Sequence, residues 1–124
     1  MDIIVDTFTQ GSDGANSIKI DTSNKTHLFS EVIGIDSSVS YVWKTYVKVL
    51  NLNSEFGFYI DEYDVSGNWI SGQWKGMISS GFDGVKTINY SPTSPSVVKV
   101  GLQYYNVGGG HNQIYLDSVE LIKN

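Results

Sequence analysis

The 124-residue chain contains no cysteine and no arginine, and only two of its residues are proline. Without cysteine, neither a disulfide nor a cysteine-ligated zinc site can form. All eight basic residues are lysine, and the formal net charge is -5. Proteins that bind phosphate backbones usually present a basic, arginine-bearing face, so we expect no nucleic-acid partner. No apolar run approaches the roughly 18 residues of a membrane span, and we expect no membrane partner.

The beginning of the chain lacks the basic segment and the apolar core of a signal peptide. Met1 is therefore either a genuine start or the start of an excised piece. We favour the excised piece, and expect this sequence to be part of a larger multidomain protein. At this length the chain is predicted to form one domain, residues 1–124, with a core of its own.

No helical period runs for long anywhere in the sequence. Extended segments alternate with turn clusters such as the triple glycine 108–110, which is the pattern of an all-β sandwich or barrel. The predicted strands are 2–9, 17–21, 27–33, 39–50, 55–64, 68–71, 85–89, 97–106 and 113–122.

Aromatic residues make up 13% of the chain and charged residues only 17%. Aromatic rings have flat apolar faces and polar rims, which match the C–H faces and hydroxyl edges of sugars. Most of the rings are expected in the core. Two strands nevertheless place tyrosine beside polar residues on their wetter faces, including Tyr46 and Tyr59, and a concave sheet face of this kind could bind a glycan chain.

The last predicted strand places an acid in an apolar row. With a period of two, Asp117 shares one face with Tyr115, Val119 and Leu121. A carboxylate is costly to bury unless a partner or a cation compensates its charge. Asp117 is therefore predicted either to bind a cation or to accept hydrogen bonds from loop amides.

Several segments occur in an order and spacing that together resemble one family. They are Gly-x-x-Ser-x-x-Ile at 14–20, a strand led by Tyr41 that ends in Tyr-Val-Lys at 46–48, Tyr-Asp-x-x-Gly-Asn at 63–68, a proline-flanked strand, and Asp-x-Val-x-Leu at 117–121. This frame resembles the jelly-roll carbohydrate-binding modules of families four, nine and twenty-two. The resemblance spans about residues 14–122.

The resemblance implies an all-β, two-sheet antiparallel jelly-roll β-sandwich that binds polysaccharide without catalysis, in an extracellular or cell-surface setting. It also implies a structural calcium held by Asp117 together with Asp13 and Gly14 of the loop before the first motif. The chain departs from the family at its N-terminus, where nothing matches the usual Asn-Pro-x-Phe-Glu-like segment. An N-terminal strand is therefore either missing or replaced by residues 2–9.

Catalytic signatures are lacking. His27 and His111 have no acid or nucleophile at an indicative spacing, and no nucleophile elbow, phosphate loop or His-Glu-x-x-His motif occurs. Asp61 and Glu62 are adjacent in a strand and so point to opposite faces. We therefore expect no enzyme activity.

Six residues are the predicted ligand contacts. Trp74 and Trp69 are expected in or beside a loop after Gly67, and the other four lie on the wetter faces of their strands: Tyr46, Tyr59, Gln103 and Tyr105. The predicted function is tethering of an attached enzyme or surface protein to a glycan. The alternative is a structural or receptor-binding domain of a cell-surface or phage tail protein, in which the rings pack against neighbouring chains.

Overall fold

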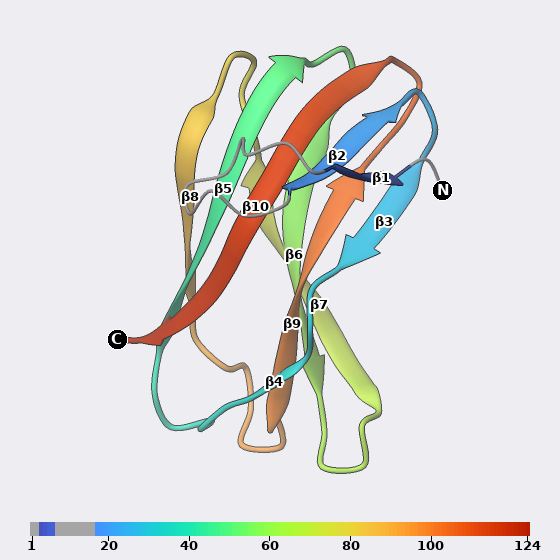
Figure 1. The fold of residues 1–124 in the computed structure, drawn as a ribbon. Coiled ribbons are helices and arrows are strands. Elements are labelled where there is room, and N and C mark those ends of the chain that lie inside the picture. Colours follow the sequence, from blue (N-terminus) through green and yellow to red (C-terminus); the bar gives the residue numbers. More distant parts are fainter. Residues whose placement is uncertain (1–2, 7–16) are drawn as a thin grey trace.

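The computed structural model describes residues 3–6 and 17–124, which form two antiparallel β-sheets (Figure 1). The first sheet has the order β1 (Ile3–Asp6), β2 (Ser17–Thr22), β10 (Asn112–Lys123), β5 (Tyr41–Asn51) and β8 (Asp83–Tyr90). The second has the order β3 (Thr26–Phe29), β9 (Lys99–Asn106), β6 (Phe56–Tyr63) and β7 (Trp69–Met77), and β4 (Ile33–Gly34) also pairs with β9. The predicted all-β, two-sheet antiparallel jelly-roll sandwich is confirmed. No helix in the described ranges is long and apolar enough to cross a membrane.

The core lies between the two sheets and follows the alternation of the sequence. Strand β5 alternates buried and half-buried residues along nearly its whole length, with Trp43 and Val47 facing inward. From the opposite sheet, Phe58 and Ile60 of β6 and Leu102 of β9 face them. Since neighbouring residues of a strand point to opposite faces, the residues between these core positions are on the outside of each sheet.

Two strand predictions are wrong in their extent. The strand predicted at 68–71 runs instead from Trp69 to Met77, so Trp74 is on a strand and not in a loop. The strand predicted at 27–33 is divided into β3 and β4. At the break, the Ser30 hydroxyl accepts a hydrogen bond from the Leu102 amide at 2.8 Å. A side-chain oxygen thus replaces the backbone carbonyl that would accept this bond in a continuous strand.

The apolar row predicted around Asp117 is also wrong, because β10 contains a β-bulge. The register with β5 shifts between Asp117 and Val119, and Ser118 has a φ of 50°. A bulge adds one residue to one strand, so it reverses which face the following residues occupy. Asp117 is opposite Tyr46, whereas Leu121 is opposite the buried Trp43 and packs against the core.

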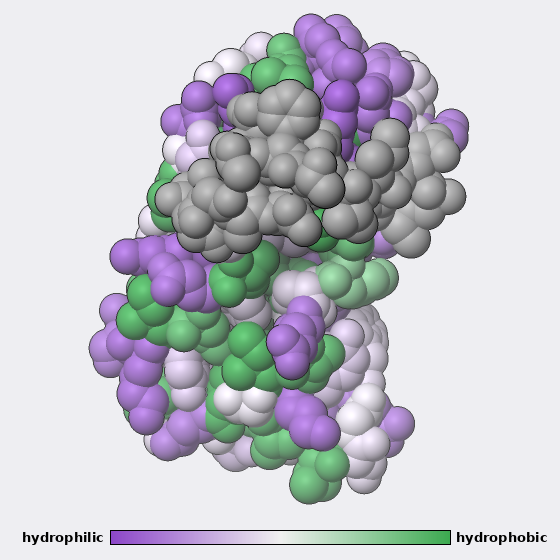
Figure 2. Space-filling model, in the orientation of Figure 1, coloured by the Kyte–Doolittle hydropathy of each residue, from purple (hydrophilic) through white to green (hydrophobic). Residues whose placement is uncertain are grey.

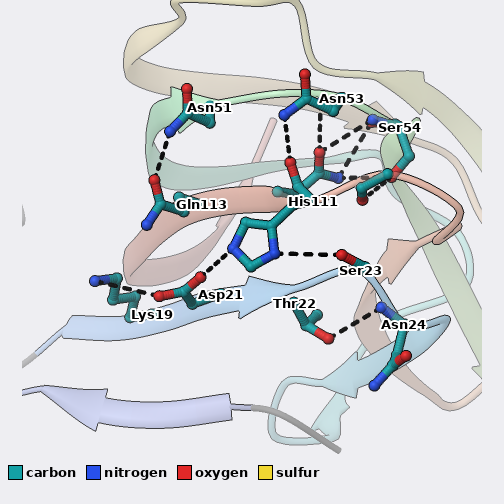
Figure 3. Close-up of polar contacts among 12 residues, drawn as sticks. Lys19, Asp21, Thr22, Ser23, Asn24, Asn51, Asn53, Ser54, His111 and Gln113 are labelled. Carbon is teal, nitrogen blue, oxygen red and sulfur yellow. Dashed lines mark hydrogen bonds and ion pairs between the residues drawn. The ribbon is translucent and has the colours of Figure 1, made fainter.

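A polar network ties the loops at one end of the sandwich (Figure 3). Fully buried Asn112 accepts a hydrogen bond from the Asn53 amide at 2.7 Å and donates one to Asn106 at 2.7 Å. The turn after β9 lies against the turn after β2 so closely that a Cβ on Gly108 would be 2.6 Å from the Lys25 nitrogen. Glycine is required there, both for this approach and for its φ of 86°.

At the other end of the core, a fully buried carboxylate links the two sheets. Glu62 of β6 accepts hydrogen bonds from Ser71 Oγ at 2.5 Å, Tyr90 OH at 2.5 Å and Thr93 Oγ1 at 2.6 Å. Burial alone would raise its pKa, but these hydrogen bonds outweigh burial and hold the pKa of Glu62 below its usual value. Burial, and then the hydrogen bond to Glu62, raise the pKa of Tyr90.

Candidate functional site

The outer face of the second sheet carries most of the exposed rings of the described part of the chain, and we call it the aromatic face. Its members come from the outward positions of four adjacent strands: His27 and Phe29 of β3, Gln103 and Tyr105 of β9, Tyr59, Asp61 and Tyr63 of β6, and Trp69 and Trp74 of β7. The inward neighbours of these residues fill the core, so the alternation of each strand places them together.

Five rings form a row that crosses all four strands. Trp74 lies 5.0 Å from Tyr59, and Tyr59 lies 5.9 Å from Tyr105, measured between ring centroids. Tyr105 stacks on His27 at 4.6 Å, and His27 stacks on Phe29 at 6.5 Å. Rings at such separations attract one another and hold a fixed orientation. The row is therefore a preformed apolar platform on the surface.

A chain of hydrogen bonds lies beside this row, and we call it the relay. It runs from Trp69 through Asp61 and Gln103 to His27. Asp61 accepts hydrogen bonds from Trp69 Nε1 and from Gln103 Nε2, each at 3.0 Å. The Gln103 Oε1 in turn contacts the Nδ1 of His27. Asp61 is only 3% exposed, which makes it the polar floor of the face. The relay fixes the indole of Trp69 although that ring is 60% exposed.

Two glycines make room for the tryptophans. A Cβ on Gly57 would be 2.2 Å from Cη2 of Trp74, so the indole lies directly over the bare backbone of β6. A Cβ on Gly72 would be 3.0 Å from Asp61 Oδ1 and 3.4 Å from Cζ2 of Trp69. Glycine at these positions lets a ring lie flat on the sheet.

The face is hollowed in two adjacent places. A hollow of about 240 Å³ is lined by residues that include Tyr59, Trp69, Gly72 and Tyr105. A wider one of about 570 Å³ is lined by residues that include Phe29, Tyr63 and Trp69. His27, Asp61 and Gln103 line both of them. The relay thus runs along the floor where the two hollows meet.

Exposed apolar side chains also gather on the aromatic face and beside it, where Met77 of β7 pairs with Gly57 of β6. Phe29 is 58% exposed, Met77 59% and Trp74 44%. Contiguous apolar patches of this kind mark binding surfaces. The side of the molecule seen in Figure 2 instead shows hydrophobic and hydrophilic residues interspersed over its coloured part.

Five of the six predicted ligand contacts come together on the aromatic face: Trp69, Trp74, Tyr59, Gln103 and Tyr105. The structure does not bring Tyr46 to it. Tyr46 is on β5 of the first sheet, and its hydroxyl donates to Asp83 of β8. This hydrogen bond raises the pKa of Tyr46.

Sequence reasoning missed His27, Phe29, Asp61 and Tyr63. A signal was present for two of them, since Asp61 and Tyr63 alternate with the core residues of β6 in step with Tyr59. Strand β3 has only four residues, too few for alternation to show that His27 and Phe29 face outward.

The predicted calcium ligands are only partly within the described residues. Asp13 and Gly14 lie outside them. The Asp117 carboxylate accepts a hydrogen bond from the Ser118 amide at 2.8 Å, a contact that needs no metal. Among residues 3–6 and 17–124, no group of three or more histidine, cysteine, aspartate or glutamate side chains could hold an ion. Calcium ligation by Asp117, Asp13 and Gly14 stays a prediction.

Spacing in the sequence indicated no acid or nucleophile for either histidine, but the fold brings a distant acid and a distant hydroxyl to His111. Pairing of β2 with β10 brings Asp21 to His111 Nε2, and Ser23 Oγ lies 3.3 Å from its Nδ1 (Figure 3). This order of side chains is that of a hydrolytic triad, but Asp21 also pairs with Lys19 at 3.7 Å and the imidazole is exposed. The hydrogen bond from His111 lowers the pKa of Asp21. We interpret these contacts as structural: they hold the turn at residues 108–110 against β2.

Comparison of the sequence with protein-family models and with curated proteins gives no match. The fold, in contrast, is similar to many solved structures. One contains the N-terminal family 22 module and family 10 module of endo-1,4-beta-D-xylanase 10B from Clostridium thermocellum, complexed with xylohexaose. It is 15% identical with a TM-score of 0.71, and the match covers 98% of this chain but only 24% of that one.

Two further structures extend the comparison. The family 11 carbohydrate-binding module from Clostridium thermocellum, in complex with a beta-1,3-1,4-mixed-linked tetrasaccharide, is 16% identical with a TM-score of 0.62, over 97% of this chain and 81% of that one. The enzymatically active domain of tailspike protein 4 from bacteriophage CBA120 is 11% identical with a TM-score of 0.68, over 98% and 18%. The chain therefore has the jelly-roll fold of carbohydrate-binding modules, and the resemblance to the family four, nine and twenty-two type is confirmed at the level of the fold.

Proposed function

We propose that the chain binds a polysaccharide on the aromatic face, without catalysis, and tethers an attached protein to that glycan. The observation that carries this proposal is the row of five rings across four strands, with a hydrogen-bonding floor beside it. Structural neighbours complexed with xylohexaose and with a mixed-linked tetrasaccharide support a glycan as the ligand.

Binding follows from the two chemical characters of a sugar chain. The C–H faces of the pyranose rings stack on exposed Trp74 and Trp69, which releases water from both apolar surfaces. The hydroxyl groups at the ring edges then reach the relay on the floor of the hollows, where Asp61 and Gln103 orient them. Because Asp61 and the rings already hold one another in place, little side-chain order is lost on binding.

The carboxylates of this face argue against hydrolysis. Glycosidases generally place two carboxyl groups on either side of the bond that they cleave. Among the described residues, Asp61 is the one carboxylate that lines the two hollows, and both of its oxygens accept hydrogen bonds from the protein. Its neighbour Glu62 is buried on the core side of the sheet. The geometry supports a binding role.

Tethering in an extracellular or cell-surface setting is the biological role that we infer. This chain corresponds to about a quarter of the xylanase structure that it resembles, which also holds a family 10 module. A domain with an exposed glycan platform is useful when it is joined to another domain, because it raises the local concentration of that domain at the polysaccharide.

Affinity electrophoresis through gels that contain β-glucan, xylan, mannan or chitosan tests the proposal. We expect at least one polysaccharide to retard the protein, and Trp74→Ala to abolish that retardation. Tyr46→Ala is the matched control, since it removes a ring from the opposite sheet and should leave retardation intact. Free migration in every gel, or equal losses in the two variants, would contradict a glycan site on the aromatic face.

A structural role in a phage tail or cell-surface assembly is the second candidate. The similarity to a tailspike domain and the exposure of Phe29 and Met77 favour it. In that case the aromatic face would pack against another chain. Sedimentation velocity separates the two roles, because a concentration-dependent oligomer that Trp74→Ala dissociates would support assembly, whereas a monomer at all concentrations would support glycan binding.

A further inference from the structure

The hydrogen-bond relay on the aromatic face has a direction that is fixed at one end. The indole Nε1 of Trp69 can only donate, and it donates to Oδ1 of Asp61 at 3.0 Å. An ionised carboxylate only accepts. The Gln103 atom that lies 3.0 Å from Oδ2 of Asp61 must therefore be its amide nitrogen.

This direction determines which nitrogen of His27 carries the proton. With its amide nitrogen turned to Asp61, Gln103 presents its carbonyl oxygen to Nδ1 of His27. A carbonyl oxygen accepts, so Nδ1 donates and holds a hydrogen in the neutral ring. The Nε2 of neutral His27 is then a lone-pair acceptor.

The Nε2 atom is available to a ligand. It has no hydrogen-bond partner among the described residues, and His27 is exposed and lines both hollows. The ring is held in place by stacking on Tyr105 at 4.6 Å and by the bond from Nδ1. A ligand in the hollows thus meets an oriented imidazole whose outer nitrogen accepts when the ring is neutral and donates when it is protonated.

We propose that the protonation state of His27 sets whether the aromatic face prefers neutral or uronic-acid-bearing glycans, so that this preference depends on pH. This inference rests on the proposed function. With His27 neutral, a uronate would meet the lone pair of Nε2 beside the acceptor Asp61, which disfavours an anion. A sugar hydroxyl can donate to Nε2 instead. With His27 protonated, Nε2–H donates to the uronate in a charge-assisted hydrogen bond, and the face favours the acidic glycan.

Within residues 18–124, few other charged groups face His27. Tyr105 of β9 stacks on it, and Asp61 of β6 reaches it through Gln103. Near its own strand, Lys25 precedes β3 and lies 5.8 Å from the centroid of the Tyr105 ring, and Glu31 follows the strand. Aspartate, glutamate, lysine and tyrosine ordinarily keep their charge states between pH 5 and 8, whereas histidine changes charge within that range.

Isothermal titration with soluble xylo-oligosaccharides, plain and glucuronic-acid-substituted, at pH 8 and pH 5 tests the inference. The ratio of the dissociation constant for the acidic ligand to that for the neutral one should fall about tenfold between pH 8 and pH 5, or about 1.4 kcal/mol. In His27→Gln the ratio should not change with pH. His111→Gln is the matched control, since it removes the other histidine, which is not on the aromatic face, and it should keep the wild-type change.

A ratio that does not change with pH in the wild-type protein, or a change that persists in His27→Gln, would overturn the role of His27 while leaving glycan binding in place. Binding of neither ligand at either pH would overturn the proposed function as well. Imidazole ¹⁵N chemical shifts give a readout that needs no variant: at pH 8 His27 should be the Nδ1–H tautomer, and the Nε2–H tautomer would contradict the relay.

Discussion

The indole of Trp69 donates to the carboxylate of Asp61 across the β6–β7 pair, at 3.0 Å. This one contact joins the most exposed tryptophan of the aromatic face to its most buried acid. A ring that projects into solvent is thereby held in a single orientation before any ligand arrives. Preorganisation of this kind spares the ordering cost that a mobile tryptophan would add to binding.

Replacement of Asp61 by asparagine should reverse the relay. The indole still needs an acceptor, so the asparagine oxygen would face Trp69 and its amide nitrogen would face Gln103. Gln103 would then turn its own amide nitrogen to His27, whose Nδ1 must become the acceptor. We expect Asp61→Asn to convert neutral His27 to the Nε2–H tautomer in ¹⁵N spectra. Asp83→Asn, on the other sheet, should leave the tautomer unchanged.

A methyl group at Gly57 should displace Trp74. Its Cβ would be 2.2 Å from the indole and 2.7 Å from the Gly76 carbonyl oxygen, so the ring must leave its place on the sheet. We expect Gly57→Ala to weaken glycan binding about tenfold or more, which corresponds to about 1.4 kcal/mol, measured by calorimetry. Gly84→Ala is the control, because a Cβ there meets nothing within 4 Å. Equal affinities of the two variants would contradict the role assigned to Trp74.

Glu62 should make stability depend on pH in the acid range. Its pKa is lowered below the ordinary 4.5 in the folded protein, so its contribution is complete above that value and is lost as pH falls through the folded pKa. At neutral pH, Glu62→Gln should lower the free energy of unfolding by about 2 to 3 kcal/mol, because donors from Ser71, Tyr90 and Thr93 lose an ionised acceptor. In urea melts the wild-type protein and the variant should converge towards acid pH. A gap that stays constant down to acid pH would show that the charge of Glu62 is not what stabilises the fold.

Calcium ligation by Asp117, Asp13 and Gly14 predicts a metal-dependent melting temperature. A ligand that binds only the folded state raises stability by mass action, by about 2.7 kcal/mol at a hundred times its dissociation constant. We therefore expect a higher melting temperature in calcium than in chelator, and loss of the difference in Asp117→Asn. Identical melts of the wild-type protein, with no metal in elemental analysis, would rule out the site.

Much of the fold could be predicted from the sequence because alternation is a local property. The period of two in β5 and β6 indicates which residues face the core, and the turn clusters separate the strands. Alternation does not indicate which sheet a strand joins, so Tyr46 and Tyr59 looked equivalent although they lie on different sheets. The bulge at Ser118 was missed because residues 115–121 were read as one unbroken alternation, although the bulge reverses the phase of the core-facing positions, from Leu116 before it to Leu121 after it.

The candidate site depends on contacts between strands that are distant in the sequence. His27 meets Gln103 across 76 positions, and Gln103 meets Asp61 across 42. These contacts exist because β9 pairs with β3 on one side and with β6 on the other, in one register. Sequence patterns predicted several members of the face but not the relay that joins them, because register is set by the packed core.

Chemical-shift mapping with a soluble xylo- or gluco-hexaose tests the central claim most directly. The largest backbone amide shifts should occur on β3, β6, β7 and β9, around His27, Asp61 and Trp74, together with a shift of the Trp69 indole N–H. Shifts confined to the outer face of β5 and β8, around Tyr46 and Asp83, would place the ligand on the other sheet and contradict the account.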